Sequence, residues 1–130
     1  MSAFQSGTVY LVEFWGTWCG PCLENIPHLT NLQARYAKDG LVVIGVASHE
    51  FKERSVLEAF MKERGAEMGY RVAYDTDLSM EKAWDTGGRE GVQFRLPISF
   101  VIDRGGRLRF VGHPSDPTMD QTIAEAIAKR

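Results

Sequence analysis

Two long runs of β-prone, apolar residues constrain the fold of this chain more than any other feature of its sequence. The first is VYLVEFW, residues 9–15, interrupted only by Glu13, and the second is LVVIGVA, residues 41–47. A strand with one face in water alternates apolar and polar residues, whereas a strand buried on both faces does not. The two runs therefore predict strands of a parallel or mixed sheet that is covered by helices.

Helix and turn signals predict the other elements. Residues 21–38 carry apolar side chains at helical spacing, and Pro27 inside this helix should kink it. Asp116 and Pro117 are a predicted N-cap and first turn of a closing helix. The sequence DRGG, residues 103–106, predicts a hairpin. Further helices are expected at residues 55–64 and 79–84, and further strands at residues 71–74, 98–102 and 108–111.

The expected order, βαβα(β)αββα, predicts one α/β domain over residues 1–130. A chain of 130 residues, 44% of them hydrophobic, is long enough to bury a core. Residues 87–91, GGREG, are expected to form a loop. The side chains expected on the inner face of the helix at 55–64 are Val56, Leu57, Phe60 and Met61.

Composition and charge exclude several classes of partner. The net charge of −2 provides no basic surface for nucleic acid. No apolar stretch approaches the roughly 20 residues that span a bilayer. The first residues, MSAFQSGT, lack the basic and apolar regions of a signal peptide. We therefore expect either a cytoplasmic protein or an excised domain of a longer one.

The chain has two cysteines, Cys19 and Cys22, both within WCGPC. A disulfide between them would close a very short loop, which makes it a weak structural staple. A closed zinc site needs four ligands. There is no second CxxC, and His28, His49 and His113 lack the spacing of paired zinc ligands. A reactive pair is the best interpretation, and surface or loop positions are expected for the histidines.

The position of the pair indicates which cysteine reacts first. Cys19 should lie at the N-terminus of the helix that follows the first strand, where unpaired N–H groups and the helix dipole favour a thiolate. Cys19 is therefore the predicted nucleophile, and Cys22, one turn further along, the buried resolving thiol. Gly20 and Pro21 let the sulfurs approach within a stiff turn, and Trp18 should flank them as an apolar contact surface.

The stretch WCGPC after an apolar strand resembles the active site of the thioredoxin superfamily. Pro27, five residues after Cys22, matches the kink proline of that family's active-site helix, and Leu96-Pro97 matches its cis-proline. The long segment 52–84 and the ending FVIDRGGRLRFVGHP are closer to the TlpA-like, or redoxin, branch than to small thioredoxins. The resemblance implies a thioredoxin-like fold: a mixed central sheet with helices on both faces, here with a short or missing N-terminal strand.

The resemblance also implies a substrate groove. In the family, the proline matched by Pro97 follows a cis peptide bond and packs against the cysteines, and the backbone of the residue before it, here Leu96, pairs with an extended substrate. Without the resemblance, Pro97 could be a trans proline entering an edge strand. The residues expected to contact substrate are Trp18, Gly20, Pro21, Arg95 and Leu96.

Glu13 lies six residues before Cys19, where thioredoxins carry a buried aspartate that moves a proton to or from the second cysteine. It shares a strand face with Val9, Leu11 and Trp15, which indicates burial. A buried carboxyl without a partner has a raised pKa, so the resemblance implies a proton relay. The alternative is a charge at the sheet edge whose tip reaches water.

Three positions depart from the family pattern. Glu13 stands where aspartate or asparagine is usual, and its side chain reaches further. Gly45 stands in place of the lysine that thioredoxins put near their aspartate. Arg95 stands where glycine is usual, two residues before Pro97. It could favour a thiolate or select an acidic partner, or it could be a solvated loop residue.

The sequence thus predicts a thiol–disulfide oxidoreductase for protein disulfides, acting as a reductant. A thiol peroxidase is a poorer alternative, because Gly16 stands where peroxiredoxins have threonine three residues before their cysteine. A non-catalytic binding domain would not need both thiols. The resemblance implies no metal or organic cofactor. It implies a monomer that meets a protein client and an upstream thiol reductant, and it favours an extracytoplasmic location over a cytoplasmic one.

Overall fold

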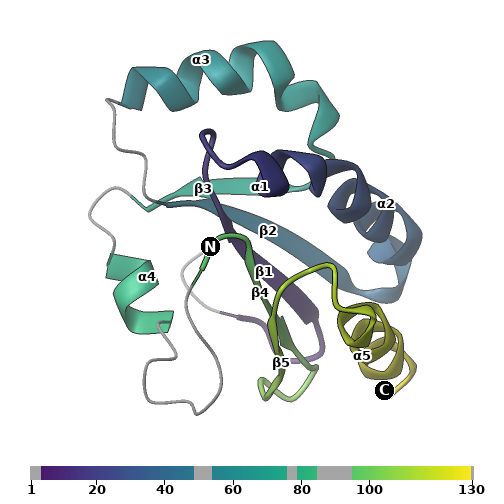
Figure 1. The fold of residues 1–130 in the computed structure, drawn as a ribbon. Coiled ribbons are helices and arrows are strands. Elements are labelled where there is room, and N and C mark those ends of the chain that lie inside the picture. Colours follow the sequence, from purple (N-terminus) through teal and green to yellow (C-terminus); the bar gives the residue numbers. More distant parts are fainter. Residues whose placement is uncertain (1–3, 49–53, 76–78, 85–94, 130) are drawn as a thin grey trace.

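The computed structural model describes residues 4–48, 54–75, 79–84 and 95–129 (Figure 1). The strands are β1 (Val9–Trp15), β2 (Leu41–Ala47), β3 (Arg71–Tyr74), β4 (Ile98–Ile102) and β5 (Leu108–Gly112). The helices are α1 (Gly20–Glu24), α2 (Ile26–Tyr36), α3 (Arg54–Arg64), α4 (Ser79–Trp84) and α5 (Pro117–Ala128), with 3₁₀ turns η1 (Ala37–Asp39) and η2 (Gly65–Glu67). The predicted α/β class is confirmed. β5 and α3 each differ from their expected bounds by one residue, and the helix expected at residues 21–38 is divided in two.

The strands form one mixed sheet in the order β3-β2-β1-β4-β5. β1 is parallel to β2, and β2 is parallel to β3. β4 is antiparallel to both β1 and β5. Because β1 lies in the middle, with a strand on either side, all seven of its residues are buried. The unbroken apolar run at 9–15 is explained by this central position.

Helices cover both faces of the sheet, as expected (Figure 1). Successive side chains of a strand point to opposite faces, so β1 contributes to two clusters. On one face Val9 and Leu11 pack with residues of α2 and α5, namely Leu29, Leu32, Met119, Ile123, Ala126 and Ile127. On the other face Tyr10, Val12 and Phe14 pack with Phe100 and with Trp84 of α4.

The helix expected over residues 21–38 is divided into α1 and α2. The break lies at Asn25, two residues before the kink predicted at Pro27. The backbone N–H of Asn25 donates to the carbonyl of Cys22 (3.2 Å), and its own carbonyl accepts from Leu29 (3.1 Å). Pro27, which has no N–H, occupies the first turn of α2, where none is required. The proline therefore starts the second helix rather than bending one continuous helix.

The inner face predicted for residues 55–64 is correct for three of its four residues. Leu57 is buried, and Phe60 and Met61 are partly buried against the cluster that contains Trp15. The prediction for Val56 is wrong, because Val56 is 36% exposed. One α3 stripe of Leu57, Phe60 and Met61 reaches the cluster, and Val56 lies to one side of it. The loop predicted at 87–91 lies outside the described residues.

The turn between β4 and β5 is held by two charged side chains. Asp103 accepts hydrogen bonds from the backbone N–H groups of Gly105 and Arg107 (both 2.9 Å) and from Arg109 Nε (2.6 Å). The Arg104 guanidinium donates to the carbonyls of Gly7 (2.7 Å), Asp39 (2.7 Å) and Ile127 (3.0 Å). The predicted hairpin is confirmed, and Arg104 ties it to three distant segments of the chain.

Candidate functional site

The two cysteines lie where β1 passes into α1, and they are joined as a disulfide with their Cα atoms 5.2 Å apart. Cys19 is the N-cap residue of α1, and its Sγ accepts a hydrogen bond from the backbone N–H of Cys22 (3.2 Å). Cys19 is 5% exposed and Cys22 is 1% exposed. Cys19 therefore has the predicted position at the helix start, and Cys22 is the more deeply buried of the two.

An exposed indole stands beside the pair. Trp18 is 51% exposed, and its ring lies against the backbone of Gly16. A Cβ atom at position 16 would come within 2.6 Å of Trp18 Nε1, so the glycine is what allows this approach. Gly20 and Pro21, between the cysteines, are both exposed. The three residues expected to contact substrate from this side are thus accessible.

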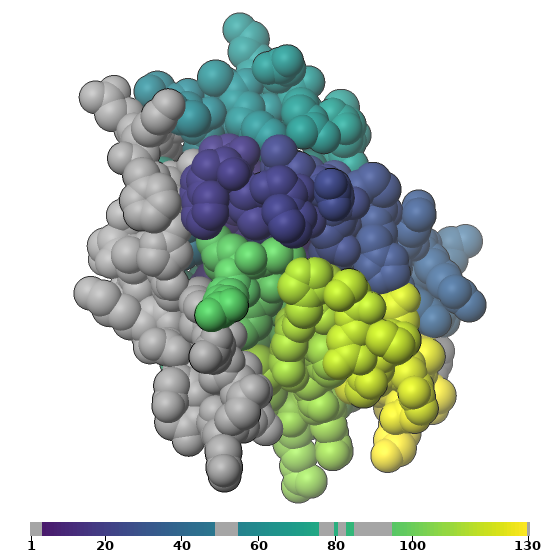
Figure 2. All heavy atoms as spheres, viewed as in Figure 1, coloured from purple at the N-terminus to yellow at the C-terminus, as the bar shows by residue number. Residues whose placement is uncertain are grey.

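The segment before β4 forms the other side of the site. The peptide bond between Leu96 and Pro97 is cis. Pro97 is buried, Arg95 is exposed, and Leu96 packs against the cluster that contains Cys19 and Cys22. In Figure 2 the start of this green segment lies directly beside the purple segment that carries the cysteines. Residues 95–97 and the cysteine pair are therefore brought together from distant parts of the sequence.

Glu13 of β1 is 1% exposed. This burial excludes the alternative that its side chain reaches water. Its Oε1 accepts hydrogen bonds from Asn25 Nδ2 (2.6 Å) and Ser99 Oγ (3.0 Å). Burial raises the pKa of Glu13 to about 8, although both hydrogen bonds act in the opposite direction. The carboxyl can therefore gain or lose a proton near neutral pH.

Asn25 and Ser99 are site residues that the sequence interpretation missed. Ser99 is the only polar residue in the strand ISFVI, and Asn25 stands between α1 and α2. Either could have been noticed as a polar residue in an apolar context. What could not be read from the sequence is that both point at one carboxyl, because Ser99 is 86 residues away from Glu13.

His28 and His113, the two histidines among the described residues, take no part in this arrangement. His28 Nε2 lies 2.9 Å from Asp120 Oδ1 and so connects α2 to α5. His113 bonds to the nearby Ser115, and His49 lies outside the described residues. In the described part of the chain, no group of three or more His, Cys, Asp or Glu side chains could hold a metal ion. Within the same residues, no helix is long and apolar enough to cross a membrane.

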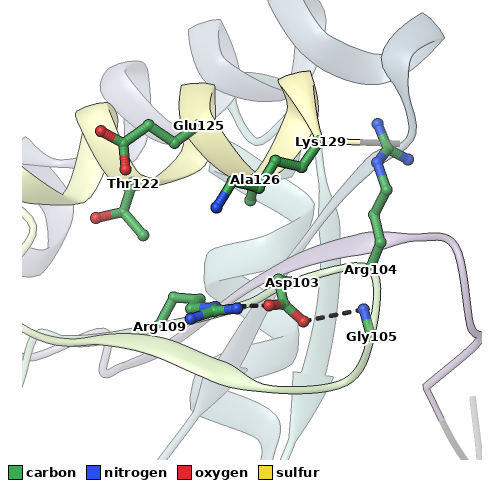
Figure 3. Close-up of a pocket in the computed structure, with 8 residues that line it drawn as sticks. All are labelled: Asp103, Arg104, Gly105, Arg109, Thr122, Glu125, Ala126 and Lys129. Carbon is green, nitrogen blue, oxygen red and sulfur yellow. Dashed lines mark hydrogen bonds and ion pairs between the residues drawn. The ribbon is translucent and has the colours of Figure 1, made fainter.

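A separate cavity of about 260 Å³ lies between the β4–β5 hairpin and α5 (Figure 3). Its lining includes the Asp103–Arg109 ion pair on one side and, on the other, Thr122 and Glu125 of α5 and Lys129, which follows that helix. None of the predicted site residues lines it. Charges of both signs face the cavity, and it is not part of the cysteine site.

Several relatives of this chain carry names that refer to disulfide chemistry. It is 29% identical over 102 residues to the thiol-disulfide oxidoreductase ResA of Bacillus subtilis, which covers 78% of this chain and 51% of the relative. It is 27% identical over 117 residues to protein FixW of Rhizobium leguminosarum, which covers 86% of this chain and 52% of the relative. The chain thus spans about half the length of these two relatives.

The fold has close structural neighbours. A crystal structure of a putative thiol:disulfide interchange protein DsbE from Chlorobium tepidum matches with a TM-score of 0.76 and 27% identity, over 94% of this chain and 82% of that one. This match confirms the thioredoxin-like fold. The sequence model of the Redoxin family matches residues 1–127. The chain therefore belongs to the redoxin family, within the thioredoxin superfamily.

Proposed function

We propose that this chain is a thiol–disulfide oxidoreductase that exchanges its Cys19–Cys22 pair with protein disulfides, acting as a reductant. The observation that carries the proposal is the disulfide at the N-terminus of α1, with the more exposed cysteine beside Trp18. The names of ResA and of the putative DsbE support the same chemistry. Gly20 and Pro21, the dipeptide found between the cysteines of reducing thioredoxins, support the reductive direction.

Reduction proceeds by two thiol–disulfide exchanges. The Cys19 thiolate attacks one sulfur of the substrate disulfide and forms a mixed disulfide, and the other substrate sulfur leaves as a thiolate. Cys22 then loses its proton and attacks Cys19 Sγ. The Cys19–Cys22 disulfide forms, and the second substrate sulfur leaves. Two electrons pass to the substrate, whose thiolates take up two protons, one of them given up by Cys22.

Glu13 is the proposed acceptor of the Cys22 proton. The ionised form of Glu13 accepts this proton, and with a pKa near 8 a fraction of the carboxyl is ionised at neutral pH. An acceptor works best when its pKa lies near that of the donor and near the working pH. An ordinary thiol has a pKa of about 8.5, close to that of the buried carboxyl. In the reverse reaction the same carboxyl would return the proton to Cys22.

The proposed substrate groove runs between Trp18 and the segment 95–97. Leu96 would offer its backbone to an extended substrate strand, and Pro97 would shape the floor of the groove. Arg95, exposed at the rim, would favour acidic substrates. We expect the Arg95→Glu variant to lose a few-fold in rate with an acidic disulfide peptide and to gain with a basic one. Equal effects on the rates with both peptides would show that Arg95 does not contact the substrate.

The proposal also covers the redox group, the reducing partner, the oligomeric state and the location. The redox group is the disulfide itself, so no metal or organic cofactor takes part. An upstream thiol reductant must reduce the pair again after each cycle. We propose one domain over residues 1–130 that acts as a monomer. An extracytoplasmic location is supported by the resemblance to the TlpA-like branch.

The test is insulin reduction with dithiothreitol as electron donor. We expect Cys19→Ser to lose the activity and Cys22→Ser to accumulate a mixed disulfide with a disulfide-containing client, visible on a non-reducing gel. Trapping by Cys22→Ser but not by Cys19→Ser would identify Cys19 as the nucleophile. Retained client binding without any turnover in the unmodified protein would contradict the proposal and indicate a binding domain.

The direction is tested by the equilibrium reduction potential of the cysteine pair, measured by thiol trapping in glutathione or dithiothreitol buffers. A value near about −270 mV, as in thioredoxin, supports a reductant. A value near about −120 mV, as in DsbA, would contradict this and indicate an oxidant.

A further inference from the structure

The strand beside Glu13 has no side chain at the matching position. Glu13 of β1 is the register partner of Gly45 in β2. Neighbouring residues in register on parallel strands project to the same face, so a side chain at position 45 would stand next to the carboxyl. The space is instead occupied by two aromatic rings. A Cβ atom on Gly45 would lie 3.0 Å from Tyr70 Cε2 and 3.1 Å from Trp15 Nε1.

Both rings belong to the buried environment of the site. Trp15 is two residues after Glu13 on the same strand face and is 2% exposed. Tyr70 is half-buried, and it packs against both the Val9–Leu11 cluster and the cluster that contains Cys22. Burial, and to a smaller degree the Glu13 charge, raises the pKa of Tyr70, so its hydroxyl stays neutral.

The groups that face Glu13 come from every element around it. β4 contributes Ser99, the α1–α2 junction contributes Asn25, and β2 contributes only the bare backbone of Gly45. Within the described residues, the cluster that contains Cys22 holds the titratable side chains Tyr70 and Tyr74 and, after reduction, the thiols of Cys19 and Cys22. No cation of the described chain is hydrogen-bonded to the carboxyl.

We infer that Tyr70 is a positioning residue: together with Trp15 it forms an aromatic cover over Gly45 that keeps water from Glu13 and so sets the pH at which this carboxyl exchanges its proton. The inference rests on the proposed role of Glu13 as the proton acceptor for Cys22. Gly45, which stands where thioredoxins have a lysine, would then have a role of its own: it gives the two rings space beside Glu13. A Cβ atom at position 45 would force the two rings to move by a few tenths of an ångström.

The inference is tested by the titration of Glu13 in the oxidised protein, followed by NMR of ¹³C-labelled glutamate carboxyl groups. The Glu13 signal is identified by its loss in Glu13→Gln. We expect Tyr70→Ala to lower the midpoint of Glu13 by about one pH unit or more, because water then reaches the carboxylate. Tyr70→Phe keeps the ring and should leave the midpoint unchanged.

Tyr36→Ala is the matched control, because Tyr36 is also a half-buried tyrosine packed on the Val9–Leu11 cluster. It should leave the Glu13 midpoint unchanged. If Tyr70→Ala fails to fold, Tyr70→Leu preserves an apolar side chain and should give a smaller fall. An unchanged midpoint in the folded Tyr70 variant overturns the inference, as does an equal fall in Tyr36→Ala.

The titration needs no thiol exchange, so its failure is distinct from failure of the proposed function. That function is tested by the pH profile of mixed-disulfide resolution in the unmodified protein and in Glu13→Gln. Identical pH profiles in the two proteins would show that Glu13 takes no part in proton transfer. The titration midpoints of Glu13 would still decide the role of Tyr70. If Tyr70→Ala moves both the pH profile of mixed-disulfide resolution and the Glu13 midpoint to lower pH, the result supports the role of Glu13 and the role of Tyr70.

Discussion

Two carboxyl groups, one in the central strand β1 and one in the turn that follows β4, have opposite properties. Glu13 in β1 is 1% exposed and accepts two hydrogen bonds from neutral side chains. Asp103, which follows β4, has a side chain that is 15% exposed. It accepts hydrogen bonds from two backbone N–H groups and from the cationic Arg109. The pKa of Glu13 rises to about 8, whereas backbone and Arg109 hydrogen bonds lower the pKa of Asp103.

The comparison shows that hydrogen bonds alone do not decide the charge of a carboxyl in this protein. Both groups are hydrogen-bonded, but only Asp103 has a cation and contact with water to stabilise its negative charge. The donors of Glu13 are neutral, and they do not replace the lost hydration. Asp103 is therefore a permanent acceptor that fixes a turn, and Glu13 is a group that can change its charge.

The largest effect expected from this difference is on the pH dependence of stability. The folded protein retains the Glu13 proton up to about pH 8, whereas the ordinary pKa of the unfolded chain is 4.5. The free energy of unfolding should therefore fall as the pH rises between these values, by at most about 1.4 kcal/mol per pH unit for this one proton. Glu13→Gln should remove that fall, so the two proteins should diverge by about 2–4 kcal/mol between pH 5 and pH 8.

The measurement is urea unfolding of the oxidised protein at a series of pH values. Glu67→Gln is a suitable control, because Glu67 is exposed and pairs with Arg64 at the surface. It should leave the slope of the unmodified protein between pH 5 and pH 8 in place. Parallel pH curves for the unmodified protein and Glu13→Gln would show that the carboxyl is not held neutral.

A smaller effect, of the opposite sign in pH, is expected at Asp103. Asp103→Ala removes the acceptor of two backbone N–H groups and of Arg109, which should cost about 1–2 kcal/mol in the free energy of unfolding at pH 7. Asp103→Asn keeps a neutral acceptor and should cost less, under about 1 kcal/mol.

The pH dependence of the Asp103 effect has a defined sign. Because the pKa in the folded protein is below the ordinary value of 3.8, the stabilisation is present above that pH and is lost as the pH falls through the lowered value. The difference between the unmodified protein and Asp103→Asn, measured by urea unfolding, should therefore shrink below about pH 4. A difference that grows in acid would contradict this assignment.

The smallest effect concerns Ser99. Its hydroxyl stabilises the ionised form of Glu13, so Ser99→Ala should raise the Glu13 midpoint further, by less than about one pH unit. The carboxyl ¹³C signal of Glu13 measures this directly. Thr122→Ala, which removes a hydroxyl bonded to a carbonyl of α5, should leave the midpoint in place. A lower midpoint in Ser99→Ala would mean that the hydroxyl favours the protonated acid.

Local patterns were sufficient for most of the fold. The apolar runs at 9–15 and 41–47 predicted β1 and β2 because a strand buried on both faces needs no polar residues. Asp116 and Pro117 predicted the start of α5, where Asp116 Oδ1 accepts from the N–H of Thr118 (2.9 Å). The errors were at the break of the first helix and at Val56, where packing between elements decides.

The sequence by itself determined the elements, the cysteine pair at a helix start and the burial of Glu13, since each depends on residues near one another in the chain. Tertiary structure alone decided what surrounds that carboxyl. Asn25 and Ser99 reach it from positions 12 and 86 residues away, and Tyr70 covers the bare strand at Gly45. The proton affinity of a buried group depends on all neighbours that replace its water, and only the packed fold brings those neighbours together.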